Sequence, residues 1–308
     1  MRKPFLRDIA LVIVPLALLC VAAPYGYNNQ MLLLNFVVFM VLAQGLNLTY
    51  GFSGYLPFGY VGFFGAGAYG FAILEMHTHT PPELALFAGG AAALLVGLIL
   101  VPLLRLQGAY FGLANLAAAQ ALYEIISNPN FQPVTGGPYG ANLQNLPYRP
   151  GEIYGIAIAI LVVLMLVVSW LRHSRFGLRL QAARDNALAA SMAGINIVRG
   201  RLIVWLISAT VAGLIGAVFA WRASTFFPET VFDLNFSIFA IVFALFGGAG
   251  TLLGPIVGVI LLYGFYNGIG ISAPQYSQLA YGILIMILVL FIPRGLASLP
   301  QRWANRHG

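Results

Sequence analysis

The chain has 308 residues, of which 60% are hydrophobic and only 7% are charged. Soluble domains carry charge on about a quarter of their residues, so this composition excludes a soluble globular protein and indicates a polytopic helical membrane protein. The formal net charge of +7 is compatible with nucleic-acid binding. However, the arginines stand at the ends of apolar runs and not in stripes with interleaved aromatic residues, which excludes nucleic acid as a partner. The single cysteine, Cys20, lies in an apolar run and excludes a disulfide framework within one chain.

Ten apolar runs approach the roughly 20 residues that a helix needs to cross a bilayer. They cover residues 8–26, 31–50, 55–75, 83–104, 108–127, 153–171, 202–221, 235–251, 254–272 and 277–293. The sequence therefore predicts an all-α bundle of about ten transmembrane spans, in one transmembrane domain over residues 1–308. The least regular runs are 55–75, for which a broken or re-entrant segment is the alternative, and the short pair 235–251 and 254–272.

The first run follows a basic N-terminus and ends near two small residues, Ala22 and Ala23. A cleaved signal peptide has the same layout. We expect an uncleaved first span instead, because a polytopic protein does not need cleavage and because nine spans would leave the new N-terminus outside.

Lysine and arginine fall almost entirely on one side of this topology. With a cytoplasmic N-terminus, thirteen of these residues lie inside and only Arg149 and Arg222 lie outside. The positive-inside rule therefore predicts that both termini are cytoplasmic. We expect a multi-pass protein of the inner (plasma) membrane. The outer loops then include residues 77–80 and the Pro-, Gly- and Asn-rich segment 128–152, which is expected to form a loop or short turns.

Small residues recur every fourth position in three places, which is typical of helices that pack closely in membranes. These sets are Gly62, Ala66 and Gly70; Ala209, Gly213 and Ala217; and Gly250, Gly254 and Gly258. Two of the glycine-rich stretches occupy loosely corresponding places in the two halves of the chain, as in transporters with internal repeats.

The chain lacks the residues for several kinds of chemistry. A phosphate-binding loop needs a lysine after its glycines, and Lys3 is the only lysine. ATP-driven transport would therefore require another subunit to bind the nucleotide. His77 and His79 make a weak metal site without a nearby carboxylate, and a solvated outer loop is the alternative. We expect no catalytic residue, metal or cofactor on this chain.

Residues 172–201 form a basic segment that cannot lie in hydrocarbon, because an arginine at the bilayer centre costs about 2.5–3.5 kcal/mol. Asp185 is expected to cap a short helix over Asn186–Ala193, which ends at Gly194. Two helical turns do not persist alone in water. We therefore expect this helix to dock on a soluble partner, with a helix lying on lipid as the alternative.

Several blocks of sequence, in order, resemble the permease subunit of ABC importers of the branched-chain amino acid type, in particular the M-type member of the H/M pair. The blocks are Gly45–Leu48, Gly51–Gly54, Phe63–Tyr69, Leu106–Phe111, Thr135–Gly140, Ser174–Gly177, Arg184–Asn186, Ala189–Ala190, Met192–Asn196, Gly247–Pro255 and Pro293–Leu296. Two departures concern the substrate more than the class. Leu188 replaces the usual Glu of the coupling signature, and residues 115–121 replace a Thr-Leu-Ala run with an acidic residue after it.

The resemblance implies a permease subunit that translocates branched-chain or similar neutral amino acids. Its implied partners are two ABC ATPase subunits that hydrolyse ATP, a homologous sister permease, a periplasmic or lipid-anchored binding protein, and membrane lipid. Urea, short amides and aromatic carboxylates are alternative substrates, and a gradient-coupled secondary transporter is the alternative from another class. The resemblance also implies ATPase coupling through Arg175, Phe176, Gly177, Arg184, Asp185, Asn186, Ala189, Ala190, Met192 and Gly194.

Polar residues inside the spans are candidates for the translocation pathway, because polar groups in a membrane need partners. They are Asn47, Tyr60, Asn115, Gln120 and Tyr123. For each of them, a hydrogen bond between helices is the alternative to contact with a substrate.

Overall fold

The computed structural model describes residues 2–27, 29–78, 80–143, 146–147 and 149–272, together with single positions beyond residue 272. Its α-helices are α1 (Arg2–Asp8), α2 (Val14–Gly26), α3 (Gln30–Leu46), α4 (Val61–Thr78), α5 (Pro82–Ile99), α6 (Ala109–Ser127), α7 (Gln132–Thr135), α8 (Pro150–His173), α9 (Arg175–Asp185), α10 (Ala187–Met192), α11 (Ile197–Ala223), α12 (Pro228–Val231), α13 (Leu234–Gly248), α14 (Gly254–Gly258) and α15 (Gly264–Ser272). Three π-helical turns continue these helices: η1 (Ile9–Ile13), η2 (Asn47–Gly51) and η6 (Val259–Tyr263). Three 3₁₀ turns connect others: η3 (Val101–Arg105), η4 (Pro129–Phe131) and η5 (Gly137–Tyr139). Two strands, β1 (Ala141–Asn142) and β2 (Thr225–Phe226), pair antiparallel with Ala141 opposite Phe226.

Six helices among the described residues are long and apolar enough to cross a membrane. They are Phe5–Gly26, Gln30–Gly51, Pro82–Ile99, Pro150–His173, Ile197–Ala223 and Pro228–Gly248. The helical membrane architecture predicted from composition is thus confirmed, with two short strands as its only departure in the described part of the chain. Ten spans are not confirmed.

The four remaining predicted spans differ from these six in specific ways. Residues 54–60 are not helical, so the helical part of the run 55–75 is α4, which begins at Val61. Helix α4 also carries the polar residues Glu75 and His77. The run 108–127 forms α6, which carries several polar side chains. The run 254–272 contains a shorter apolar helix over Gly254–Gly270, and 277–293 falls almost entirely outside the described residues.

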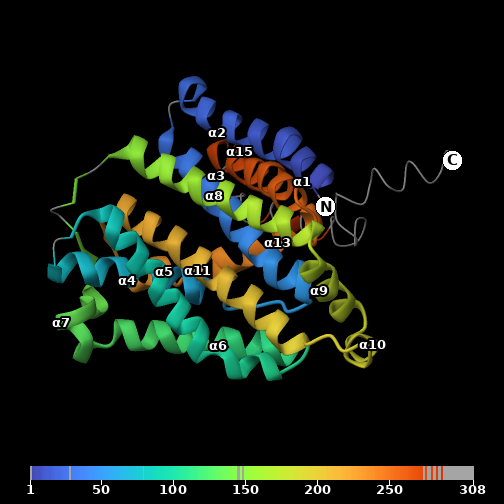
Figure 1. The fold of residues 1–308 in the computed structure, drawn as a ribbon. Helices are drawn as coiled ribbons and strands as arrows, with labels where there is room; N and C mark the ends of the chain where they lie inside the picture. Colours follow the sequence, from blue (N-terminus) through green and yellow to red (C-terminus); the bar gives the residue numbers. More distant parts are fainter. Residues whose placement is uncertain are drawn as a thin grey trace.

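Helix α11 lies at the centre of the bundle and packs against α4, α5, α3 and α8 (Figure 1). Its small face meets α5 in register: the Cβ position of Gly97 lies 3.1 Å from the Ala209 Cβ, and that of Gly89 lies 2.6 Å from the Ala217 Cβ. A side chain on Gly67 of α4 would overlap the backbone of Gly213. The small-residue pattern of α11 therefore marks close contacts of this helix with α4 and α5.

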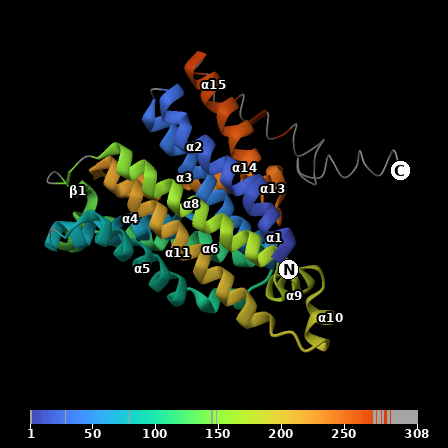
Figure 2. The same ribbon diagram turned by 45° about the horizontal axis from the view of Figure 1, so that its top comes forward.

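Charge distinguishes the two ends of the bundle. One end of the bundle carries Arg149, next to the start of α8, and Arg222, in the last turn of α11. The other end carries Arg172, in the last turn of α8, together with Arg199 and Arg201 near the start of α11. The N-terminus lies at the same end as α9 and α10 in both views, and α7 lies at the opposite end (Figures 1 and 2). This relative placement agrees with the arginine pattern. The side of the membrane that each end faces stays a prediction, and the predicted placement of the C-terminus lies outside the described residues.

The segment 128–152, predicted as loop or short turns, folds as η4, α7, η5 and β1, and α8 already begins at Pro150. Pairing of β1 with β2 fixes this segment to the end of α11, and the Trp221 Nε1 donates a hydrogen bond to the Pro147 carbonyl at 3.3 Å. The described residues of this segment thus cover the end of the bundle opposite α10.

Candidate functional site

The basic segment 172–201 is shaped by three side-chain caps of the same kind. The Ser174 hydroxyl accepts from the Gly177 N–H, the Asn186 amide oxygen from the Ala189 N–H, and the Asn196 amide oxygen from the Arg199 N–H, each at 3.0 Å. Each cap satisfies an N–H group that the first turn of a helix leaves free. The segment therefore has a defined shape, although each of its helices is short or amphipathic.

Asn186, and not Asp185, is the N-cap of the short helix. Asp185 is the last residue of α9, whereas Asn186 has an extended backbone and caps α10, which is shorter at both ends than the predicted Asn186–Ala193. Because α9 extends through Asp185, it is the next residue, Asn186, whose side chain accepts the hydrogen bond from the Ala189 N–H. Gly194 ends α10 as predicted, with φ of 75° and hydrogen bonds from the N–H groups of Gly194 and Ile195 to earlier carbonyls.

Helix α10 turns an apolar face away from the rest of the chain. Leu188 is 72% exposed and Met192 82% exposed, and Ala189 is exposed beside them. Ala190, in contrast, is 5% exposed and packs inside the segment. The predicted coupling residues of α10 thus divide into an outward set, Ala189 and Met192, and an inward residue, Ala190.

At the start of the segment, Arg175 is exposed and Phe176 stacks on Trp170 with 6.4 Å between ring centroids. Gly177 is buried, and a side chain there would overlap the carbonyl of Leu171. Phe176 and Gly177 therefore pack at the corner between α8 and α9, whereas Arg175 faces outward.

Arg184 connects the basic segment to the membrane-embedded helices. Its Nη1 donates to the Gly51 carbonyl at the end of η2, and its Nε lies 3.4 Å from the Asp185 carboxylate. Its side chain also lies against the positions where Gly54 and Gly250 would carry a Cβ. Arg184 thus contacts the two interrupted helices, α3–η2 and α13–α14, at the places where they are interrupted.

Asn47 fixes these two interruptions to each other. Its Nδ2 donates to the Thr251 carbonyl at 2.9 Å and to the Gln44 Oε1 at 2.9 Å, and its Oδ1 accepts from the Gly250 N–H at 2.6 Å. Gln44 in turn donates to the Leu252 carbonyl at 2.6 Å. The polar atoms of the Asn47 side chain are thus all paired inside the chain, in the arrangement expected for a bond between helices. We call Gln44, Asn47 and residues 250–252 the amide clamp.

Tyr60 is also paired inside the chain: its hydroxyl donates to the Ser208 carbonyl at 3.1 Å and accepts from the Ser208 hydroxyl at 3.0 Å. Asn115 is different. It is 1% exposed, and its Oδ1 has no hydrogen-bond partner among the described residues. A buried amide oxygen without a partner costs about 1–3 kcal/mol, so a ligand, a water or a second subunit would stabilise the protein by reaching it.

The other two pathway candidates lie with Asn115 on α6. Gln120 is exposed, and its Nε2 donates to the exposed Glu124 at 3.1 Å. Tyr123 is half-buried, with its ring at an angle to Phe232 and 6.2 Å between centroids. The five candidates therefore do not converge on one cavity: Asn47 and Tyr60 lie between helices of the bundle, whereas the other three are on α6, which lies at its edge beside α4.

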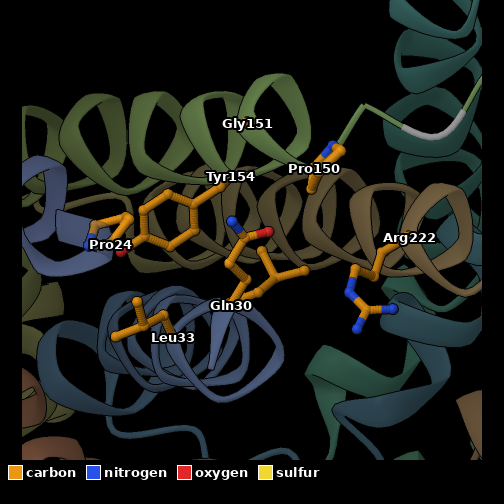
Figure 3. A pocket seen from close by; sticks show the side chains of 8 residues that line it. Pro24, Gln30, Leu33, Pro150, Gly151, Tyr154 and Arg222 are labelled. Carbon is orange, nitrogen blue, oxygen red and sulfur yellow. The ribbon is translucent and has the colours of Figure 1, made fainter. Parts of the chain in front are cut away.

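A small cavity lies at the end of the bundle opposite α10, between the ends of α2 and α11 and the starts of α3 and α8. Figure 3 shows Tyr154, Gln30 and Arg222 around it. Its volume of about 60 Å³ is well below the roughly 300–1,000 Å³ of typical small-molecule pockets. It admits waters, and none of the predicted pathway residues lines it.

Two polar residues of this site were not predicted from the sequence. Gln44 stands in the middle of an apolar run and is fully buried, and Thr251 caps α14 through its hydroxyl, which accepts from the Gly254 N–H at 3.0 Å. A lone amide in an apolar run was the available signal for Gln44, because such a group needs a partner in a membrane.

Comparison with known proteins is consistent with this arrangement. Residues 29–290 match the model of the family described as branched-chain amino acid transport system / permease component. Similar proteins include the high-affinity branched-chain amino acid transport system permease protein LivM of Escherichia coli, 28% identical over 86% of this chain and 69% of LivM. They also include the ribose import permease protein RbsC of Bacillus subtilis, 29% identical over 58% of this chain and 57% of RbsC. No solved structure matches the chain.

The family match covers most of the chain, including the amide clamp and the basic segment. Together with the six apolar helices, they identify a multi-pass protein of the inner membrane. The chain belongs to the family of permease components of branched-chain amino acid transport systems, which are ABC-type permeases.

Proposed function

We propose that this chain translocates branched-chain or similar neutral amino acids as one permease of an ATP-binding-cassette importer. Two ATPase subunits bind and hydrolyse ATP, a homologous sister permease completes the membrane unit, and a periplasmic or lipid-anchored protein delivers the substrate. This chain binds no ATP or other cofactor itself. The observation that carries the proposal is the contact of Arg184 with both interrupted helices, which joins a solvent-exposed helix to the membrane interior.

In this proposal α10 is the surface that the ATPase contacts. Its exposed apolar face, Leu188, Ala189 and Met192, is small enough for close approach and is isolated among charged residues. Arg184 and Asp185 precede α10 in the chain and are separated from it only by Asn186. A displacement of α10 therefore moves Arg184 and, through its contacts, Gly51 and Gly250. Helix interruptions clamped by a few hydrogen bonds can adopt two packings, which is what alternating access requires.

The translocation pathway is proposed to run along α6, between this chain and its sister. Exposed positions follow one face of this helix at helical spacing: Tyr110, Leu113, Ala117, Gln120 and Glu124. An exposed Gln–Glu pair is unfavourable against lipid, where polar groups are expensive. Lining an aqueous path or a second subunit removes that cost.

The substrate is tested with the complete transporter in proteoliposomes. Leucine, isoleucine and valine are expected to be taken up when ATP and the cognate binding protein are present. Ribose, urea, short amides and aromatic carboxylates serve as competitors, since the relatives of this chain include a ribose permease. Uptake by the purified chain alone under an ion gradient would overturn the proposal in favour of a secondary transporter.

The proposed orientation is tested by thiol labelling in a Cys20→Ser background. Two exposed positions at opposite ends of the bundle suit the labelling, Asn142 in β1 and Ala182 in α9. Asn142→Cys is expected to react with an impermeant reagent in intact cells and Ala182→Cys only after permeabilisation. The reverse pattern would place α10 outside and contradict ATPase docking there.

A further inference from the structure

A second cavity lies in the basic segment, between α9 and the start of α11. Its volume is about 400 Å³, within the range of pockets that hold small molecules. It is lined by Phe176, Arg179, Leu180, Ala183, Ala193, Gly194, Ile195, Asn196, Ile197, Arg199, Gly200 and Ile203. Two of these residues are cationic and none is acidic. Anything that fills the cavity therefore meets a positive, partly apolar surface.

The two arginines are free to bind an anion. Neither Arg179 nor Arg199 forms an ion pair within the described residues. They stand on opposite walls, one on α9 and the other in the first turn of α11. The first turn of a long helix adds a partial positive charge to its side of the cavity. A phosphate group between them would accept charge-assisted hydrogen bonds from both guanidinium groups.

Each arginine is accompanied by an apolar residue one helical turn away on the same wall. Ile203 follows Arg199 by four residues on α11 and is 44% exposed, and Phe176 precedes Arg179 by three residues on α9. Both apolar residues lie nearer to an adjoining span: Ile203 is inside Ile197–Ala223, and Phe176 stacks on Trp170 at the end of Pro150–His173. The cavity is thus cationic at its outer part and apolar toward the bilayer, and the exposed Trp170 is typical of a membrane interface.

From this polarity we infer that the cavity binds an anionic phospholipid, with its phosphate headgroup between Arg179 and Arg199 and the start of an acyl chain along Phe176 and Ile203. A free phosphate would use only the cationic part, whereas a lipid uses both. Bound there, the lipid joins α9 to α11 next to the turn at Gly194, which ends α10, and so stiffens the segment that carries Arg184.

The experiment is native mass spectrometry of the transporter complex purified from membranes in mild detergent, supplemented with phosphatidylglycerol, phosphatidylcholine or inorganic phosphate. The wild-type complex is expected to retain phosphatidylglycerol and not phosphatidylcholine, and excess inorganic phosphate is expected not to displace the lipid. The double variant Arg179→Gln/Arg199→Gln should weaken retention about 30-fold, because a cation at an anionic lipid surface contributes about 1 kcal/mol. Ile203→Asn should weaken it too, because the acyl chain loses its apolar wall.

The matched control is Arg105→Gln/Arg172→Gln, which removes the same charge from exposed positions outside the cavity and should retain lipid like the wild type. Equal lipid retention by both double variants would overturn the inference. Displacement of the lipid by inorganic phosphate would point to a phosphate site instead. Unchanged lipid retention combined with loss of the ATPase subunits from Arg179→Gln/Arg199→Gln would assign the cavity to the ATPase and also overturn it. The readout is lipid retention, so it stands apart from the test of transport.

Discussion

The basic segment and the amide clamp are both irregular parts of a helical protein, but they are held in opposite ways. In the segment, Ser174, Asn186 and Asn196 each cap a backbone N–H group three residues later. In the clamp, Asn47 and Gln44 bond to carbonyl and N–H groups more than 200 residues away. Local caps let a segment move as a unit. Long-range bonds inside a membrane fix one arrangement of helices until they are broken together.

Arg184 is the residue in which these two kinds of order meet. It belongs by sequence to the locally capped segment and by contact to the interruptions that the clamp fixes. The difference between the regions therefore predicts different consequences of mutation: loss of stability in the clamp, loss of coupling at Arg184, and loss of partner binding alone on α10.

The largest effect is expected from Asn47→Leu. The substitution leaves the Gly250 N–H, the Thr251 carbonyl and the Gln44 Oε1 without their partner in a buried place, which costs about 2–4 kcal/mol of unfolding free energy in total. Thermal unfolding in detergent, followed by the fluorescence of the buried Trp205 and Trp221, measures it. Gln120→Leu, an exposed amide, is the control and should leave the transition in place. An unchanged transition for Asn47→Leu would mean that the clamp contributes nothing to the fold.

A smaller effect on stability, and a large one on function, is expected from Arg184→Ala. Because Arg184 is more than a third exposed, loss of its hydrogen bond should cost only about 1 kcal/mol. ATP hydrolysis should no longer respond to the substrate-loaded binding protein, since α10 loses its contact with Gly51 and Gly250. Reconstituted ATPase and uptake assays measure this, with Arg105→Ala as the exposed control. Normal stimulation by the loaded binding protein would remove Arg184 from the coupling route.

The local order of the segment could be predicted from its sequence, because a cap and the group it bonds lie within a few residues. Gly194 ends its helix as expected, and the error at Asp185 is a shift of one position. The interruption between α13 and α14 falls at the boundary expected between the short runs 235–251 and 254–272. The contacts that could not be predicted join residues far apart in the sequence. The residues around Asn47 do not indicate that its amide binds the Thr251 carbonyl, and those around Arg184 do not indicate that its guanidinium binds the Gly51 carbonyl.

The same reason explains the pathway candidates. A polar residue in an apolar run is expected to have a hydrogen-bond partner, but the sequence does not indicate which group that partner is. Asn47 and Tyr60 have partners within the chain, whereas the Asn115 Oδ1 has none among the described residues. The number of spans stays a prediction, because α4 and α6 carry polar residues and the run 277–293 lies almost entirely outside the described residues.

An effect on partner binding alone is expected from Ala189→Trp. Ala189 is exposed, so a tryptophan there should leave thermal unfolding unchanged while overfilling a close contact with the ATPase, at a cost of about 1–3 kcal/mol. Co-purification of the ATPase and uptake should both fall. Ala182→Trp, exposed on α9, is the control. Ala190→Trp is less informative than its sequence position indicates, because Ala190 is buried and the substitution would deform the segment itself. Normal ATPase binding by Ala189→Trp would mean that α10 rests on lipid.

The smallest effect is expected from Leu188→Glu, which restores the residue that the coupling signature of importer permeases usually has. Leu188 is exposed and lies in the first turn of α10, directly after the Asn186 cap and Ala187. A carboxylate in the first turn of a helix is favourable by about 0.3–1 kcal/mol, so the helix should form at least as well as in the wild type. Because Leu188 is exposed, its replacement should cost little packing within the chain. ATPase binding and uptake should therefore match those of the wild type in the same assays that detect Ala189→Trp. A loss as large as that of Ala189→Trp would show that the partner surface of this transporter has adapted to an apolar residue at position 188, and the docking contact would then be centred on Leu188 and not on the small residues beside it.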